Sequence, residues 1–229
     1  MALTPLNSDV VVIGAGTSGL SAAKSLKDIG YSVIVIEAAK HIGGRCVTDN
    51  SIFDIPFDIG GSWLHSAVTN PLAEIAVQNN FKLHKKNWSH TWVHSNGVNL
   101  SSKQTKEYSQ YIEDMWQNIN KAGKNKKDQS IEKSLPEAKW RDIARNQIAP
   151  MMGADPDVCS AHDVFHFTNT EGDWLVENGL GAFIKYLYKD IEVITNCAAK
   201  KIDYSSNGVK VETPDGVITA TYAVLTVST

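Results

Sequence analysis

The sequence predicts an α/β fold built around a Rossmann-like parallel sheet, and three observations lead to this prediction. An apolar, β-branched run at 9–13 is followed at once by a glycine-rich turn. Apolar residues then recur at helical spacing, and a second apolar run at 33–36 ends on an acidic residue. The order strand, glycine turn, helix, strand and acid is typical of a dinucleotide-binding unit.

The first elements follow from local patterns. The run Asp-Val-Val-Val-Ile at 9–13 favours a parallel strand that is buried on both faces. A helix is expected from Leu20 to Ile29, and Gly30 should end it. The second strand is expected over 33–36, where every residue is Val or Ile.

The glycine turn between the first strand and the helix has the pattern G-x-G-x-x-G. Gly14 allows a tight turn, Gly16 lets the backbone approach a pyrophosphate, and Gly19 lets the helix pack close to the strand. The helix N-terminus adds free N–H groups and a positive dipole end. Glu37 follows Gly14 by 23 positions, where an acid accepts hydrogen bonds from a ribose. An acid there disfavours NADP, so NAD and FAD both remain open on this element alone.

Two further glycine segments follow, Ile42-Gly43-Gly44-Arg45 and the stretch 57–65. Paired glycines indicate a close backbone approach or a positive φ. An arginine beside such a pair suits a diphosphate, because its fork makes bidentate, charge-assisted hydrogen bonds. Taken singly, each segment also fits a surface turn.

Together these segments resemble the flavin-containing amine oxidases, the group of monoamine and polyamine oxidases with related desaturases and protoporphyrinogen oxidases. The matching stretches are VVVIGAGTSGLSAAKSL, VIVIEAAKHIGGRCVTD and FDIGGSWLH. Later, 196–202 resembles the family's strand N-x-x-V-x-x-I, and 174–181 resembles the turn and helix start before it. The sequence departs from the pattern at Gly61, where alanine is usual, and at Ser66, where glycine is usual.

The resemblance implies a flavoenzyme with a Rossmann-like FAD-binding domain of the glutathione-reductase-like type and part of an α+β substrate domain. It implies oxidation of an amine to an imine, with oxygen as acceptor and hydrogen peroxide as product. Trp63 and His65 would line the substrate pocket, and no catalytic acid or base is assigned. The residues implied to contact FAD are Gly14, Ala15, Gly16, Ser18, Gly19, Glu37, Gly44, Arg45, Gly60, Gly61, Ser62, Trp63 and Ala199.

Two alternatives stay open. A related FAD-dependent desaturase or protoporphyrinogen-type oxidase would use the same nucleotide segments, although the Trp63-Leu64-His65 triplet favours the amine group. The other alternative is a non-catalytic, truncated flavin-binding fragment. The resemblance places a catalytic lysine and a second FAD segment beyond the part of the family that this chain matches, so we expect a C-terminally truncated chain.

Three segments are expected. Residues 1–81 form the first part of the FAD-binding domain, and 82–172 form a helical cap belonging to the substrate domain. Amphipathic spacing predicts a helix over 103–119 and another over 136–148. Residues 173–229 return to the FAD-binding domain as a β-meander. Its strands are expected over 192–194, 199–204, 208–213 and 217–220, followed by a buried strand over 222–227.

Composition limits the remaining possibilities. Of 229 residues 42% are hydrophobic and the net charge is −3, which indicates a globular protein with no electrostatic case for nucleic acid or a membrane surface. Met1 to Asp9 shows no secretory pattern, and the three cysteines are odd in number and far apart. We therefore expect a reducing, cytoplasmic location. His162 and His166 have metal-ligand spacing without a convincing third ligand, so no metal site is expected.

Overall fold

The computed structural model describes residues 6–85, 94–95, 97–167 and 170–228. The chain divides into two compact units, which are described separately. The first unit comprises Met1–Lys86 and Thr170–Thr229, and the second comprises Asn87–Asn169. The sequence-based boundaries were 81/82 and 172/173, and the roles assigned to those segments stay predictions.

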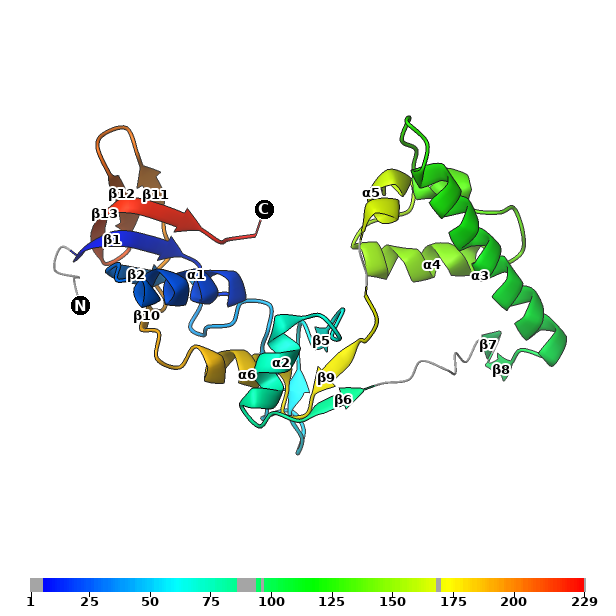
Figure 1. Ribbon diagram of the computed structural model, residues 1–229, viewed down its shortest axis with the longest axis horizontal. Coiled ribbons are helices and arrows are strands. Elements are labelled where there is room, and N and C mark those ends of the chain that lie inside the picture. Colours follow the sequence, from blue (N-terminus) through cyan, green and yellow to red (C-terminus); the bar gives the residue numbers. More distant parts are fainter. Residues whose placement is uncertain (1–5, 86–93, 96, 168–169, 229) are drawn as a thin grey trace. The chain divides into compact units, whose positions relative to one another are not determined.

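A six-stranded mixed sheet with the order β10-β2-β1-β13-β12-β11 forms the centre of the first unit. Strand β1 (Leu6–Ile13) lies between β2 (Val33–Ile36) and β13 (Gly216–Leu225) and is parallel to both. The neighbouring β1 and β13 are the blue and red arrows of Figure 1. Strand β10 (Val193–Ile194) adds to β2, also in parallel. The predicted α/β class with a Rossmann-like sheet is confirmed.

The returning strands differ from the expected meander at two points. Strands β11 (Lys201–Asp203) and β12 (Val209–Thr213) form an antiparallel hairpin, and β12 continues into β13. The two strands expected over 217–220 and 222–227 are one continuous strand, β13, because its first half pairs with β12 and its second half pairs with β1. The second half is not buried as expected, since Tyr222 and Leu225 are 60% and 57% exposed.

Helix α1 (Thr17–Asp28) covers one face of this sheet, as the apolar spacing predicted. Its buried Leu20 and Ala23 pack with Val10, Val12 and Val35. The other face carries a second cluster, in which alternate residues of β1 and β2 pack with the hairpin: Val11, Ile13, Ile36, Cys197, Val211, Ile218 and Ala220. Strand β1 is therefore buried on both faces, which explains its unbroken apolar run.

The rest of the first unit consists of short elements. Strands β5 (Trp63–Leu64), β9 (Trp174–Val176) and β6 (Leu83–Lys85) form a three-stranded sheet with β9 in the middle. Strands β3 (Thr48–Asp49) and β4 (Phe57–Asp58) form a separate pair, and the two remaining helices are α2 (Pro71–Gln78) and α6 (Leu180–Leu187).

The second unit contains the helices α3 (Ser102–Gly123), α4 (Arg141–Met152) and α5 (Ala161–His166), the 3-10 turn η1 (Ile131–Ser134), and the strands β7 (His94–Ser95) and β8 (Val98–Asn99). Helix α3 contains the predicted 103–119 helix and buries the apolar stripe that predicted it. It begins with a capping box, in which the side chains and backbone N–H groups of Ser101 and Gln104 bond reciprocally.

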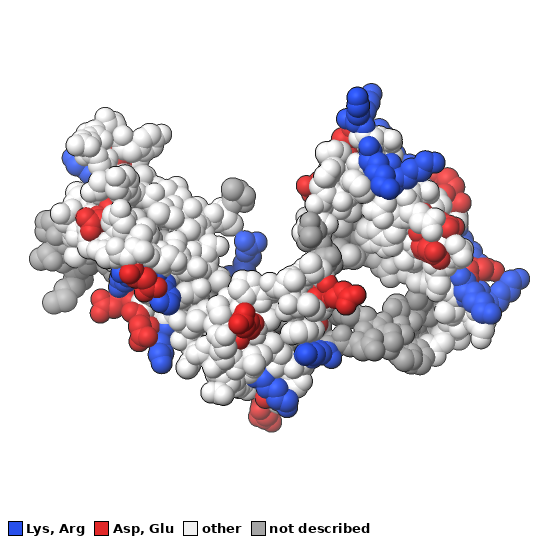
Figure 2. All heavy atoms as spheres, viewed as in Figure 1, with Lys and Arg blue, Asp and Glu red and all other residues white. Residues whose placement is uncertain are grey.

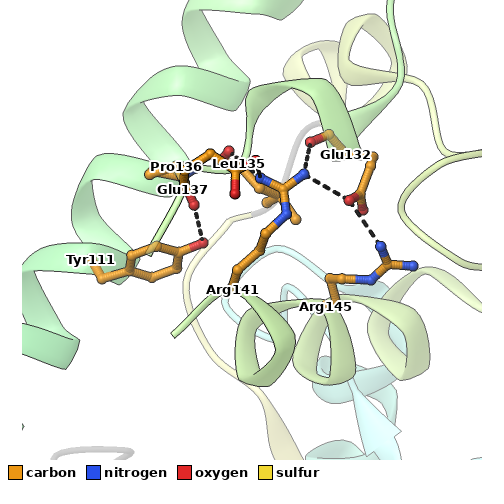
Figure 3. A network of polar contacts seen from close by, with 7 residues as sticks. All are labelled: Tyr111, Glu132, Leu135, Pro136, Glu137, Arg141 and Arg145. Carbon is orange, nitrogen blue, oxygen red and sulfur yellow. Dashed lines mark hydrogen bonds and ion pairs between the residues drawn. The ribbon is translucent and has the colours of Figure 1, made fainter. Parts of the chain in front are cut away.

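The helix predicted over 136–148 begins later, at Arg141, and Figure 3 shows the polar contacts of this first helical residue. The Arg141 guanidinium donates to the carbonyl oxygens of Leu135 and Glu132 and to the carboxylates of Glu132 and Glu137. Arg145 also donates to Glu132 Oε1, at 2.9 Å. These bonds connect the first turn of α4 to η1 and to the segment 135–137 that precedes the helix.

Several surface features bear on partners. Acidic and basic side chains lie interspersed over the second unit on the face seen in Figure 2. Among the described residues, no helix combines the length and apolar character needed to cross a membrane. His162 and His166 lie on α5 with ring centroids 4.2 Å apart. The described residues contain no group of three side chains suited to hold a metal.

Candidate functional site

A cavity of about 500 Å³ lies in the first unit, where the carboxyl ends of β1, β2 and β13 meet. In open α/β sheets, ligands bind at this end of the strands. Eleven of the eighteen residues that line the cavity were not predicted as FAD contacts. Seven lining residues were predicted as FAD contacts: Gly14, Gly16, Ser18, Glu37, Gly44, Arg45 and Ala199.

The N-terminus of α1 opens onto this cavity. Gly16 is the N-cap residue and provides no side-chain hydrogen bond, and the first turn contains no acidic residue. Thr17 and Ser18, the first two helical residues, line the cavity. A helix end without a side-chain cap or an acid keeps its N–H groups and its positive dipole end for an anion.

Gly14 and Gly19 have the roles predicted for them, in the tight turn and in the close packing of α1 on β1. Gly14 has a φ of 105°, which favours glycine. A Cβ at Gly19 would lie 1.9 Å from the carbonyl oxygen of Gly14, so a larger residue would push α1 away from β1. Gly16 differs, because its φ is −72° and a Cβ would meet nothing closer than 3.8 Å. The protein itself therefore leaves room at Gly16, on the wall of the cavity.

The second glycine segment folds back on the first. Gly43 donates its N–H to the carbonyl oxygen of Ala15 at 2.8 Å. Gly44 has a φ of 58°, and a Cβ there would lie 3.0 Å from the Cα of Gly16. Two backbone segments without side chains thus face each other across the mouth of the cavity, where a ligand can approach both closely.

Glu37 ties the end of β2 to both sides of the cavity. Its Oε2 accepts the N–H of Ala15 at 2.7 Å, and its Oε1 accepts the N–H of Ala39 at 2.8 Å. Its backbone N–H and C=O bond to Ile194 and Cys197. Each carboxylate oxygen can accept a second hydrogen bond, so Glu37 keeps capacity for a ligand hydroxyl.

Arg45 supplies a cation at the cavity. Its side chain is exposed and lines the cavity, and among the described residues its guanidinium has no ion-pair partner. A guanidinium that is not engaged by a carboxylate keeps its fork for a phosphate. The cavity thus combines a helix N-terminus, a free guanidinium and a carboxylate that can accept hydroxyl groups.

The remaining predicted contacts lie outside the cavity lining: Ala15, Gly19, Gly60, Gly61, Ser62 and Trp63. A Cβ at Gly60 would lie 2.0 Å from the carbonyl oxygen of Arg45, and Gly61 donates its N–H to that oxygen at 2.8 Å. These glycines therefore position the Arg45 backbone. Trp63 belongs to β5 and His65 follows it.

Thr226, which directly follows β13 and lines the cavity, was not predicted from the sequence. Its hydroxyl group lies 3.1 Å from the carbonyl oxygens of both Ile13 and Gly14. Cys46 and Cys197 also line the cavity. Thr226 reaches the cavity through the parallel pairing of β13 with β1, which joins residues more than 200 positions apart, so no local sequence pattern predicts it.

Comparison with known proteins assigns the family. The model of the family "Flavin containing amine oxidoreductase" matches residues 17–229. The chain belongs to the flavin-containing amine oxidoreductase family. This confirms the family that the sequence resembles and agrees with a cavity suited to a dinucleotide.

Curated relatives within this amine oxidoreductase family include plant polyamine oxidases. The chain is 27% identical to polyamine oxidase 4 of Oryza sativa subsp. japonica over 235 aligned positions, which cover 90% of the chain and 48% of the relative. It is 29% identical to polyamine oxidase 2 of Arabidopsis thaliana, again over 90% of the chain and 48% of the relative. The chain therefore spans about half the length of these relatives.

Among solved structures, wild-type putrescine oxidase bound to putrescine superimposes with a TM-score of 0.71 and 21% identity. The match covers 98% of this chain and 59% of that one. At this identity the comparison shows the fold alone, and it agrees with the α/β architecture of this chain.

Proposed function

We propose that the chain binds FAD in the cavity and is the FAD-binding portion of an enzyme that oxidises an amine to an imine. Oxygen is the acceptor and hydrogen peroxide the product. The observation that carries this proposal is the uncapped N-terminus of α1 opening onto the cavity beside Glu37 and Arg45. Membership of a flavin-containing family supports the identity of the dinucleotide.

Each side of the cavity suits one part of FAD. The backbone of Gly14 and Gly16 and the start of α1, which line the cavity, would hold the pyrophosphate, and Arg45 would add a cation to it. Glu37 accepts hydrogen bonds from the adenosine ribose. The backbone of Ala199, which also lines the cavity, would contact the adenine. We place the flavin ring along 60–63, with Trp63 and His65 on the substrate side.

The chemistry divides between cofactor and chain. When bound, the flavin takes up the hydride that leaves the amine carbon and returns the electrons to oxygen. The chain then needs to bind the dinucleotide, orient the amine and exclude water, and we assign no acid or base. The relatives named as polyamine and putrescine oxidases support an alkylamine as the substrate class.

Reduction of the flavin by amines tests this proposal. The purified chain is saturated with FAD, made anaerobic and mixed in turn with butylamine, 1,4-diaminobutane and spermidine, while flavin absorbance is followed. At least one amine is expected to bleach the flavin, and admission of oxygen should restore the colour with formation of peroxide. Bound FAD that no amine reduces would contradict amine oxidation by this chain.

A second function is favoured by one observation, namely that the chain spans 48% of the polyamine oxidases it matches. In that case the chain binds FAD without turning over amines. The same experiment separates the two functions, because the flavin spectrum appears in both, whereas bleaching by amines appears only in the first.

A further inference from the structure

His65 and Asp173 meet in the first unit although 108 positions separate them. The antiparallel register of β5 and β9 pairs Leu64 with Trp174 and so brings the next residues together. Nδ1 of His65 lies 2.7 Å from Oδ1 of Asp173. Because an ionised carboxylate only accepts, Nδ1 carries the hydrogen, and the neutral ring presents Nε2 as an acceptor.

The backbone that carries His65 is fixed as well. The carbonyl oxygen of His65 accepts a hydrogen bond from Asn70 Nδ2 at 3.0 Å. The following residue, Ser66, has a φ of 52°, a conformation that costs a non-glycine residue free energy. Thr170 N–H donates to Ser66 Oγ at 3.1 Å and helps to hold this conformation. The positive φ also explains why glycine suits position 66.

The histidine ring is open on its other side. The side chain of His65 is 72% exposed, whereas that of Asp173 is 34% exposed. Pairs this exposed contribute about 0–1 kcal/mol to stability. The contact therefore does little for stability, and its main effect is to fix the direction and tautomer of a ring whose Nε2 remains accessible.

We propose that Asp173 is a positioning residue, whose carboxylate holds His65 so that Nε2 accepts an N–H hydrogen bond from the substrate amine. The proposal rests on the proposed function, which puts His65 on the substrate side. An alkylamine is the matching ligand class, because its N–H groups donate to an acceptor nitrogen. The carboxylate acts through the ring, as in other carboxylate–histidine pairs.

The tautomer of His65 is the first test. Long-range ¹H–¹⁵N NMR of the histidine-labelled chain is recorded at a pH where imidazoles are neutral. The wild type should show His65 with hydrogen on Nδ1, and Asp173→Ala should move it toward the Nε2–H form. Asp173→Asn, whose amide oxygen still accepts, should retain the wild-type form. If His65 of the wild type carries its hydrogen on Nε2, the proposal is overturned. This outcome is measured on the wild type alone and does not depend on whether a variant folds.

Glu177→Ala is the matched control. Glu177 directly follows β9, as Asp173 directly precedes it, and its carboxylate accepts a hydrogen bond from Lys82 Nζ at 2.8 Å. The substitution should leave the His65 signals unchanged. In a second experiment, 1,4-diaminobutane is titrated into each protein. The His65 Nε2 signal should move in the wild type and in Glu177→Ala, with binding about 2- to 10-fold weaker in Asp173→Ala.

Absence of any shift of the wild-type Nε2 signal with the diamine overturns the positioning role and leaves the pair a structural contact. Failure of the proposed function is seen separately, in the flavin experiment, because the tautomer of His65 is measured without FAD. Equal diamine affinity in the wild type and a folded Asp173→Ala also overturns the inference.

Discussion

Glu37 Oε2 accepts the backbone N–H of Ala15 at 2.7 Å, so the acid that ends β2 is bonded directly to the glycine turn that follows β1. This contact fixes the distance between two walls of the cavity before any ligand arrives. It also places the carboxylate where its remaining lone pairs can meet hydroxyl groups. A preformed wall of this kind reduces the ordering cost of binding.

The first prediction concerns this carboxylate. Glu37→Gln keeps one acceptor oxygen, for the Ala15 N–H, but turns an NH2 group toward the Ala39 N–H and loses the charge that strengthens hydrogen bonds from a ribose. Loss of charged hydrogen bonds worth about 1.5–3 kcal/mol should weaken FAD binding about 10- to 100-fold. Quenching of flavin fluorescence on titration measures the affinity. Glu74→Gln, on α2 and outside the cavity lining, is the control and should bind like the wild type.

Two neighbouring glycines should respond oppositely to alanine. A Cβ at Gly60 would lie 2.0 Å from the carbonyl oxygen of Arg45, so Gly60→Ala forces a backbone shift and should cost about 1–3 kcal/mol. At Gly61 the nearest atom would be Cys46 Sγ at 3.7 Å, an ordinary contact. Gly61→Ala should be neutral or stabilising by about 0.4–1 kcal/mol. Urea midpoints measure both, and equal losses would disprove the packing described for Arg45.

The third prediction concerns the second unit. Arg141 donates four hydrogen bonds through its planar fork, three of them to atoms of Glu132 and Leu135. Lysine cannot reproduce this geometry, so Arg141→Lys should lower the free energy of unfolding by about 1.5–3 kcal/mol. Arg145→Lys alters a single bond to Glu132 and should cost under about 1 kcal/mol. Similar losses in thermal or urea unfolding would count against a special role for Arg141.

The fourth prediction concerns acid stability. Hydrogen bonds from the Ser160 side chain and then from the His162 backbone N–H lower the pKa of Asp128 from its ordinary 3.8. A lowered folded-state pKa stabilises the protein above the ordinary value, and the contribution disappears as pH falls through the folded-state value. The stability difference between the wild type and Asp128→Ala should therefore be constant near neutral pH and shrink below pH 3.8. A difference that grows on acidification would be inconsistent with this.

Local sequence patterns predicted those helices and strands whose formation depends on residues close together in the sequence. The strand at 33–36 and helix α1 follow from apolar spacing and from glycines that stop or permit a turn. The late start of α4 was not predicted, and neither were the hydrogen bonds from Arg141 to the carbonyl groups of Glu132 and Leu135, because helical spacing within 136–148 carries no signal for them. Strand β13 was expected as two strands, since the sequence does not show that β12 and β1 pair with successive halves of it.

The candidate site also contains residues that the sequence predicted and residues that it did not. The residues of the glycine turn, Glu37 and Arg45 meet at one cavity, as the spacing and the family resemblance indicated. Thr226 and the pairing of His65 with Asp173 were missed, because both arise from contacts between residues more than 100 positions apart. Gly60 and Gly61 were expected as cofactor contacts, whereas in this structure they pack on the backbone of Arg45. Their contact with a flavin stays a prediction.

The central claim, that the cavity at the start of α1 holds FAD, is tested most directly with Gly16→Ala. The protein has room for this methyl group, since φ is −72° and the nearest atom would lie 3.8 Å away, so stability should change by less than about 1 kcal/mol. The methyl group would stand where we propose that the pyrophosphate of FAD binds. FAD titration should give tight binding by the wild type and by Glu74→Gln, whose side chain lies outside the cavity lining, and binding at least about 10-fold weaker by Gly16→Ala. Equal FAD affinity in a folded Gly16→Ala, or no FAD binding by the wild type, would contradict the account.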